Sequence, residues 1–224
     1  MKPALLDLFC SEGGAARGYQ LAGFRVAGVD IDPQPLYVGD EFFQDDALDV
    51  LRDRSFLRSF DVVSASPPCQ RYSDLAKRNG NAEDWPDLVG IVRTRLQQAG
   101  VPYVIENVEG APLDNPVMLC GTMFPELRVL RHRLFESNLT LTAPEHRPHP
   151  LVFTHDKRKA HYGKLDQDTS FVQVTGGGNA TLANKRAAMG MPWATGHGCN
   201  EAIPPAYSEH IGRQLIAQLE SRAA

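Results

Sequence analysis

The chain has 224 residues, of which 42% are hydrophobic and 22% are charged, and its net charge is −4. This composition supports one packed domain and excludes a disordered chain, while the acidic balance excludes a broadly basic nucleic-acid coat protein. The N-terminal apolar stretch ends at Asp7 and no run of about 18 apolar residues follows, so we expect neither a signal sequence nor a membrane span. We therefore expect the protein to be cytoplasmic.

The first 110 residues alternate between short apolar runs and helix-like segments. Strands are predicted at 4–9, 24–29, 42–44, 60–65 and 101–105, and helices at 14–21 and 86–99. This alternation is typical of parallel strands joined by right-handed crossovers, and it predicts a doubly wound α/β sheet. Beyond residue 128 the pattern weakens, with strands predicted at 134–141, 151–155 and 172–174 and helices at 183–189 and 205–219.

The charge is unevenly distributed along the chain. Residues 1–130 carry 12 − 19 = −7, whereas residues 131–164 carry 7 − 3 = +4 and five of the seven histidines. The basic segment is either an ordinary solvated surface or a patch that faces phosphate groups. In the second case Lys157, Arg158 and Lys159 are the cations we expect at the phosphates.

Polar residues follow the predicted strands at the ends where open parallel sheets bind ligands. Gly13 and Gly14 follow the first strand, and Asp30 follows the second. Glycines let the backbone approach a ligand, and a carboxylate accepts hydrogen bonds from ribose hydroxyls. Because the spacing is not G-x-G-x-x-G, both a nucleoside-type cofactor site and a plain tight turn stay open.

Cys69 lies in the loop Pro67-Pro68-Cys69-Gln70 after the fourth strand, among polar residues and not in the apolar company of a structural cysteine. The two prolines stiffen this loop. Glu106, at the end of the next strand, is placed to face the same cleft. A thiol beside an acid suggests covalent catalysis with proton transfer, although a structural cysteine is the open alternative.

Together these segments resemble motifs of the C5-cytosine DNA methyltransferase family. The matching segments, in the family's order, are 7–14 (DLFCSEGG), 66–73 (SPPCQRYS), 106–108 (ENV), 131–133 (RHR) and 202–205 (AIPP). The resemblance spans nearly the whole chain and is to the compact, bacteriophage-encoded form. It implies a Rossmann-like class I methyltransferase fold, with a SAM-binding and catalytic domain at 1–136, a reduced target-recognition insertion at 137–184 and a C-terminal segment at 185–224.

The resemblance implies methyl transfer from S-adenosylmethionine to C5 of a flipped cytosine in double-stranded DNA, leaving S-adenosylhomocysteine. Cys69 would add to C6 of the base, Glu106 would engage N3, and Arg133 with Arg131 would hold the flipped nucleotide; Asn107 would tie the glutamate loop to the cysteine loop. The residues implied at the cofactor are Phe9, Cys10, Ser11, Gly13, Gly14, Asp30, Ile31, Asp46, Ala47, Pro68, Glu201 and Ala202. Those implied at the DNA are Gln70, Ser73, Lys157, Arg158 and Lys159.

Three features depart from the family pattern. Ser11 stands where the family most often has glycine, which is tolerable if its φ is ordinary. Glu201 stands where many relatives have asparagine, and we expect it to repel a carboxylated cofactor analogue. The insertion at 137–184 is short for a recognition domain, so we expect a short or degenerate DNA site and salt-sensitive binding.

Two alternatives keep the fold and change the function. One is an RNA (tRNA) cytosine-5 methyltransferase, and the other is a SAM-binding subunit that needs a separate DNA-targeting partner. We expect a monomer. We expect no metal, because His146 and His149 lack sequence neighbours at metal-ligand spacing, and we expect Cys120 in the core.

Overall fold

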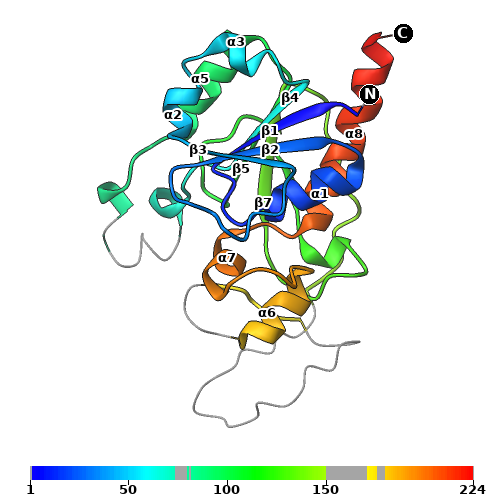
Figure 1. The fold of residues 1–224 in the computed structure, drawn as a ribbon. Coiled ribbons are helices and arrows are strands. Elements are labelled where there is room, and N and C mark those ends of the chain that lie inside the picture. Colours follow the sequence, from blue (N-terminus) through cyan, green and yellow to red (C-terminus); the bar gives the residue numbers. More distant parts are fainter. Residues whose placement is uncertain (1, 74–79, 81, 150–170, 176–179, 224) are drawn as a thin grey trace.

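The protein is described by a computed structural model that covers residues 2–73, 80, 82–149, 171–175 and 180–223 (Figure 1). Seven strands form one sheet in the order β3-β2-β1-β4-β5-β7-β6. They are β1 (Ala4–Leu8), β2 (Arg25–Asp30), β3 (Glu41–Gln44), β4 (Val62–Ala65), β5 (Tyr103–Asn107), β6 (Val117–Leu119) and β7 (Arg133–Ser137). The first five are parallel, which confirms the doubly wound sheet, while β7 runs antiparallel to both β5 and β6.

The helices are α1 (Gly14–Ala22), α2 (Ala47–Val50), α3 (Arg54–Leu57), α5 (Val89–Ala99), α6 (Leu182–Met189), α7 (Gly196–Glu201) and α8 (Pro205–Ala223). They follow the predicted alternation, but two of them have shifted ends and the short helices α2, α3 and α7 were not predicted. Helix α5 begins three residues after Pro86, and α8 continues past the predicted end at 219. The short helix α7 was not predicted, because its sequence GHGCNE has poor helix propensity; the hydroxyl of Thr195 caps it by accepting from the amide of Gly198.

Helices cover both faces of the sheet, as alternate residues of each strand require. Leu5 of β1 packs in the core beneath α1 and α8, and Leu6 packs in the opposite core beneath α3 and α5. Figure 1 shows α1 and α8 on one side of the sheet and α2, α3 and α5 on the other. Packing on both faces therefore fixes the parallel strands, whose carboxyl ends lie side by side.

Helix α8 returns the C-terminal part of the chain onto α1. A side chain at Gly18 would place its Cβ 2.0 Å from the carbonyl oxygen of Pro205, so only glycine permits this approach. Gly13, with φ +84°, makes the turn from β1 into α1. Helix α1 and the start of α8 are thereby in close contact.

Both flanks of the insertion predicted at 137–184 are tied to the body of the protein. The amide of Val172 donates to the carbonyl of Arg128 (2.8 Å), and the amide of Leu130 donates to the carbonyl of Val172 (2.9 Å). On the other flank, Thr140 and Thr142 exchange hydrogen bonds with the side chains of glutamines on α8. The strand predicted at 151–155 and the glycine run 176–178 lie outside the described residues.

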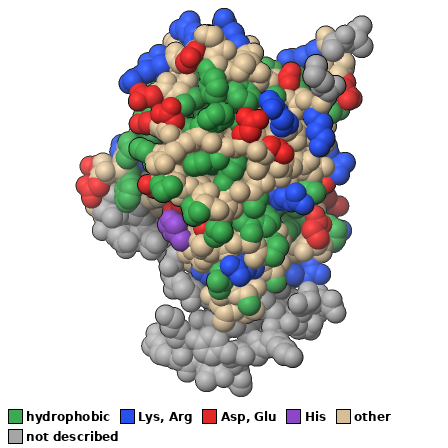
Figure 2. Space-filling view, in the orientation of Figure 1, with side chains coloured by type: hydrophobic (Ala, Val, Ile, Leu, Met, Phe, Trp, Pro, Cys, Tyr) green, Lys and Arg blue, Asp and Glu red, His purple; other side chains and the backbone are tan. Residues whose placement is uncertain are grey.

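The surface carries no single dominant charge on the face that Figure 2 shows, where acidic and basic side chains are interspersed between apolar ones. None of the helices in the described part of the chain is both long and apolar enough to cross a membrane.

Candidate active site

A cavity of about 300 Å³ lies at the carboxyl ends of the central strands. The predicted site residues that line it are Phe9, Cys10, Ser11, Gly14, Asp30, Ile31, Pro68, Cys69, Gln70, Glu106, Arg133, Glu201 and Ala202. A larger, open hollow at the amino ends of the strands, near Lys2, Arg25 and Leu219, contains none of them. The cavity therefore joins the predicted cofactor residues to the predicted catalytic ones.

Cys69 sits in the loop that leaves β4, half-buried, with its main-chain carbonyl accepting from the amides of Tyr72 (3.0 Å) and Ser73 (3.1 Å). These bonds start the turn Gln70–Tyr72 and fix the loop that carries the thiol. Burial raises the pKa of the Cys69 thiol, and the Arg133 guanidinium opposes this rise. The cation thus favours the reactive thiolate in an otherwise unfavourable site.

Glu106, at the end of β5, is buried and forms an ion pair with Arg133 of β7, with 3.0 Å between Oε1 and Nε. The contact is an ion pair only, because its angles are not those of a hydrogen bond. Burial raises the pKa of Glu106, and Arg133 and Arg131 oppose the rise. A buried carboxyl with a raised pKa takes up a proton more readily than an exposed one and can deliver it to a substrate.

Asn107 links the loops of the two catalytic candidates. Its side-chain amide donates to the carbonyl of Pro67 (2.9 Å), and its side-chain oxygen accepts from the amide of Val108 (2.9 Å). Asn107 is buried, so both bonds are shielded from water. The structure contains the link between the glutamate and cysteine loops that the sequence led us to expect.

Arg131 does not lie where the sequence led us to expect it. Its side chain is 6% exposed, does not line the cavity, and donates to the carbonyls of Val174 (2.7 Å) and Asn200 (2.5 Å). Burial lowers its pKa to about 9, with Arg133 adding to the effect. Arg131 therefore ties the segments of Val174 and Asn200 to the residues just before β7.

On the cofactor side, Asp30 ends β2 and organises the neighbouring loop. One carboxylate oxygen accepts from the amide of Ser11 (2.8 Å), and the other accepts from the amide of Asp32 (3.1 Å). Ser11 has φ +46° and Phe9 has φ +62°, both in the left-handed region. The condition that Ser11 keeps an ordinary φ is therefore not met: the backbone has a glycine-like conformation with a serine in it.

Four other predicted site residues do not line the cavity. Asp46 caps α2 by accepting from the amide of Leu48 (2.8 Å), and Ala47 is buried in the core. Gly13 supplies the turn before α1, and Ser73 ends the turn after Cys69. Lys157, Arg158 and Lys159 lie outside the described residues.

Two acidic residues of the first motif were not assigned a role from the sequence. Asp7 lines the cavity and is 1% exposed, and burial, with Glu106 and Asp30 nearby, raises its pKa to about 8. Ser64 and Ala16 approach its carboxylate, without hydrogen-bond geometry. The sequence could have indicated a role for Asp7, because a charged residue interrupts an otherwise apolar strand.

The second is Glu12, which is buried and accepts from the amide (2.7 Å) and hydroxyl (2.5 Å) of Thr195. Trp193 packs against the core, and its ring N–H donates to the carbonyl of Glu12 (3.0 Å). Nothing in the local sequence indicates this contact, because its partners are about 180 residues apart.

The expectation about the histidines is wrong on one point. His146 and His149 do have potential metal-ligand neighbours, because the fold brings them to Cys120 and His132. Cys120 is buried, as expected, but its sulfur faces this cluster. Sequence spacing missed it because the four residues come from three separate segments.

Comparison with known proteins finds one matching family and several solved structures that resemble this chain. Residues 4–114 match the model of the C-5 cytosine-specific DNA methylase family. No curated protein matches the chain. A solved structure described as a DNA modification methyltransferase encoded within an E. coli prophage is similar over 97% of this chain and 99% of its own, with 14% identity and a TM-score of 0.64. The S. pombe Dnmt2 methyltransferase matches 63% of this chain and 52% of its own, with 18% identity and a TM-score of 0.42.

Proposed function

Because residues 4–114 match the model of the C-5 cytosine-specific DNA methylase family, we propose that the chain transfers a methyl group from S-adenosylmethionine to C5 of a cytosine in double-stranded DNA. The observation that carries the proposal is the convergence of Cys69, Glu106 and Arg133 in one cavity with Asp30. A thiol, a buried acid and a cation are the groups needed to activate a pyrimidine ring, and Asp30 is suited to a nucleoside.

The cavity fits S-adenosylmethionine in size and chemistry. Its volume of about 300 Å³ is in the range of small-molecule pockets, and Phe9 and Ile31 offer apolar surface beside the Asp30 carboxylate. The backbone at Gly14 has no room for a side chain, since a Cβ would lie 2.8 Å from the carbonyl of Ile203. Phe9, Ile31 and Asp30 would hold the nucleoside, and the cofactor would supply an electrophilic methyl group.

Glu201 is the residue that would face the amino-acid end of the cofactor. It lines the same cavity and pairs with His197 at 3.2 Å. A carboxylate there favours an ammonium group and opposes a carboxylated analogue, so plain S-adenosylmethionine is the preferred donor. Tighter binding of the carboxylated analogue by the purified chain would contradict this preference.

The catalytic steps follow from the chemistry of the three side chains. The Cys69 thiolate forms a bond to C6 of the cytosine, while protonated Glu106 donates to N3 and Arg133 donates to O2, so that the electron pair moves to C5. C5 would then accept the electrophilic methyl group that the cofactor supplies. A base would remove the C5 proton, the C6–S bond would break to return the thiolate, and N3 would give its proton back to Glu106. Because C5 is inaccessible inside a duplex, the base must leave the stack at a cost of a few kcal/mol.

DNA recognition would depend on residues 137–184, together with Gln70 beside Cys69. This segment is short, so its contacts would mostly position phosphates and the recognition site would be short or degenerate. The chain would act as a monomer in the cytoplasm of a bacterial or phage-infected cell. A strict methylated site of six or more base pairs in sequenced DNA would contradict the reduced specificity.

Covalent trapping tests the function directly. With S-adenosylmethionine and duplex DNA containing 5-fluorocytosine, the C5 substituent cannot leave as a proton, so the protein should stay attached through Cys69. A denaturing gel should show the adduct, and peptide mass spectrometry should locate it. Cys69→Ser should give no adduct but retain cofactor binding, whereas Cys199→Ser, which changes a buried cysteine outside the cavity, should still give it.

Two further arms separate the alternatives. An adduct on 5-fluorocytosine tRNA and none on duplex DNA would identify an RNA enzyme. Cofactor binding with no adduct on either nucleic acid would contradict an enzyme that acts alone and would indicate a subunit that needs a targeting partner.

A further inference from the structure

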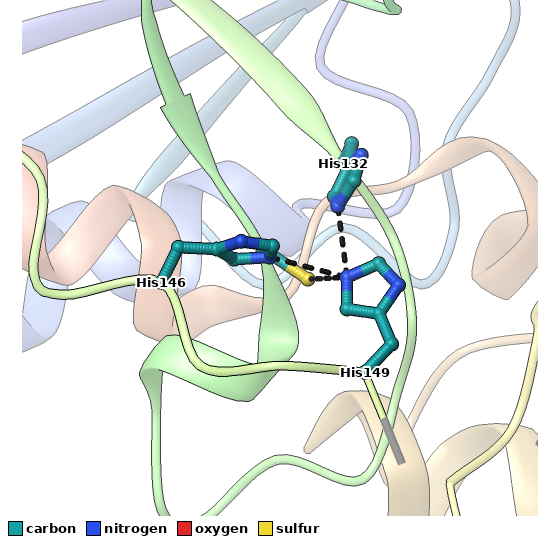
Figure 3. Close-up of side chains that lie close together, drawn as sticks. His132, His146 and His149 are labelled. Carbon is teal, nitrogen blue, oxygen red and sulfur yellow. Dashed lines mark hydrogen bonds between the residues drawn. The ribbon is translucent and has the colours of Figure 1, made fainter. Parts of the chain in front are cut away.

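Four side chains from three segments converge at one point beside the catalytic domain (Figure 3). Cys120 follows β6, His132 immediately precedes β7, and His146 and His149 lie on the segment beyond β7. Their sulfur and ring nitrogens all lie within 4.8 Å of one another. The Nε2 atom of His149 is central, 3.0 Å from Nε2 of His132, 3.1 Å from Nε2 of His146 and 3.4 Å from the Cys120 sulfur.

Hydrogen bonding cannot account for this convergence. A neutral ring nitrogen carries either one hydrogen or one lone pair, so Nε2 of His149 can satisfy one neighbour and not three. Protonation of all three rings would instead bring like charges together at about 3 Å. A cation at the centre would use every lone pair at once.

The spacing is close to that of a tetrahedral zinc site. Zinc–nitrogen bonds of about 2.05 Å and zinc–sulfur bonds of about 2.3 Å place nitrogens about 3.3 Å apart and sulfur about 3.6 Å from nitrogen. The three contacts of His149 lie within a few tenths of an ångström of these values. His146 meets the rings of His132 and His149 edge-on, at 70° and 81°, and the rings of His132 and His149 are tilted by 51°, so no pair is stacked.

The surroundings supply outer contacts of the kind that metal ligands have. The Nδ1 atom of His132 lies 3.0 Å from a carboxylate oxygen of Glu109, which fixes the tautomer that leaves Nε2 free to bind. The hydroxyl of Thr122 lies 3.5 Å from the Cys120 sulfur, as a donor to a thiolate would. A carboxylate–histidine pair and a hydroxyl–sulfur contact thus orient two of the four ligands.

We propose that Cys120, His132, His146 and His149 bind one Zn²⁺ ion in a structural site. One thiolate and three imidazoles match the preference of zinc, and four protein ligands leave no open position for catalysis. The ion would fix His132, and with it the main chain between Arg131 and Arg133. It would also fasten the segment of His146 and His149, which leads directly into residues 150–170. The site stands independently of the proposed methyl transfer.

Metal analysis of the full-length protein tests the site. After purification, exposure to excess zinc and removal of free metal, the chain should retain one zinc per molecule. Cys120→Ser and His149→Ala should each lose stoichiometric zinc. Cys199→Ser and His197→Ala are the matched controls and should retain it, because neither residue belongs to the cluster.

Two measurements do not depend on how well a ligand variant folds. Cobalt in place of zinc in the unmodified chain should give the visible absorption of a tetrahedral site and a sulfur-to-metal charge-transfer band. Glu109→Gln, which keeps all four ligands, should weaken zinc affinity by about 10- to 100-fold. Unmodified protein that retains no zinc, or a Cys120→Ser variant that retains it fully, would overturn the proposal.

Discussion

The side-chain amide of Asn107 donates a 2.9 Å hydrogen bond to the carbonyl of Pro67, two residues before Cys69. It is the direct tie between the end of β5, which carries Glu106, and the loop that carries the thiol. Asn107→Ala leaves a buried carbonyl without a donor, which costs about 1–3 kcal/mol of stability. We expect kcat to fall by up to about 100-fold, since small displacements of reacting groups have effects of this size, while KM for the cofactor stays nearly constant.

Asn138 provides the control, because it bridges the same part of the protein at the other end of β5. It donates to the carbonyl of Val101 (3.0 Å) and accepts from the amide of Tyr103 (2.9 Å). Asn138→Ala should cost similar stability and leave kcat at temperatures below unfolding unchanged. Equal losses of kcat in the two variants would show that Asn107 acts on stability alone.

Arg133 is expected to set the ionisation of Cys69. Its cation opposes the rise that burial causes in the pKa of the thiol, so Arg133→Gln should raise that pKa further. Fewer thiols would then be ionised near neutral pH, and alkylation of Cys69 by iodoacetamide, followed by peptide mass spectrometry, should need a more alkaline pH. The alkylation rate at neutral pH should fall about tenfold for every increase of about one in the pKa of the thiol.

Arg25→Gln serves as the control, because Arg25 forms an exposed pair with Glu41 outside the cavity. Its alkylation profile should match that of the unmodified protein. A profile for Arg133→Gln that stays in place would show that the guanidinium does not influence the thiol.

The parallel half of the fold was predictable because each strand is a short apolar run that ends in a polar residue. The end of β2 at Asp30 and the loop at Cys69 are therefore located correctly from sequence. The antiparallel pair β6 and β7 was not predicted as a pair, since β6 has only three residues and its register depends on contacts with β7. Local patterns carry little information about such pairing.

The site was predictable where a motif places a side chain directly at a strand end, as for Glu106 and Cys69. It was not predictable where a side chain turns toward a distant partner. Arg131 lies two residues from Arg133, yet it reaches carbonyls of residues 174 and 200, which only the folded chain brings near. The same applies to Glu12 and Thr195.

Ser11 is a position where substitution should increase stability. Its φ of +46° is unfavourable for a residue with a Cβ, at a cost of about 1–2 kcal/mol, and glycine removes that cost. Glycine also makes the unfolded chain more flexible, so the net gain from Ser11→Gly should be about 0.5–1 kcal/mol in chemical unfolding. Ser221→Gly, in the last turn of helix α8, should instead lose stability, because the glycine there only adds backbone freedom to the unfolded chain. Destabilisation by Ser11→Gly would mean that the serine side chain makes a stabilising contact.

Asp7 should make the protein less stable as the pH rises from about 4 to about 8. Its folded pKa is raised from 3.8 to about 8, chiefly by burial, so the folded state binds a proton that the unfolded state releases. The stability from this group is complete below the unfolded pKa and is lost on approach to the folded one, with a slope of at most about 1.4 kcal/mol per pH unit. Asp7→Asn should flatten urea unfolding free energies measured across this range.

Asp53→Asn distinguishes this effect from a general change in charge. Asp53 is an exposed cap of α3 whose pKa is lowered by hydrogen bonds with the amide of Phe56 and with Ser55. Losing that carboxylate should weaken the cap but leave the slope between pH 5 and 8 in place, because Asp53 is ionised throughout in both states. If Asp7→Asn kept the slope of the unmodified protein, another buried group would have to bind the proton, and Glu106, whose pKa is also raised, would be the next to replace.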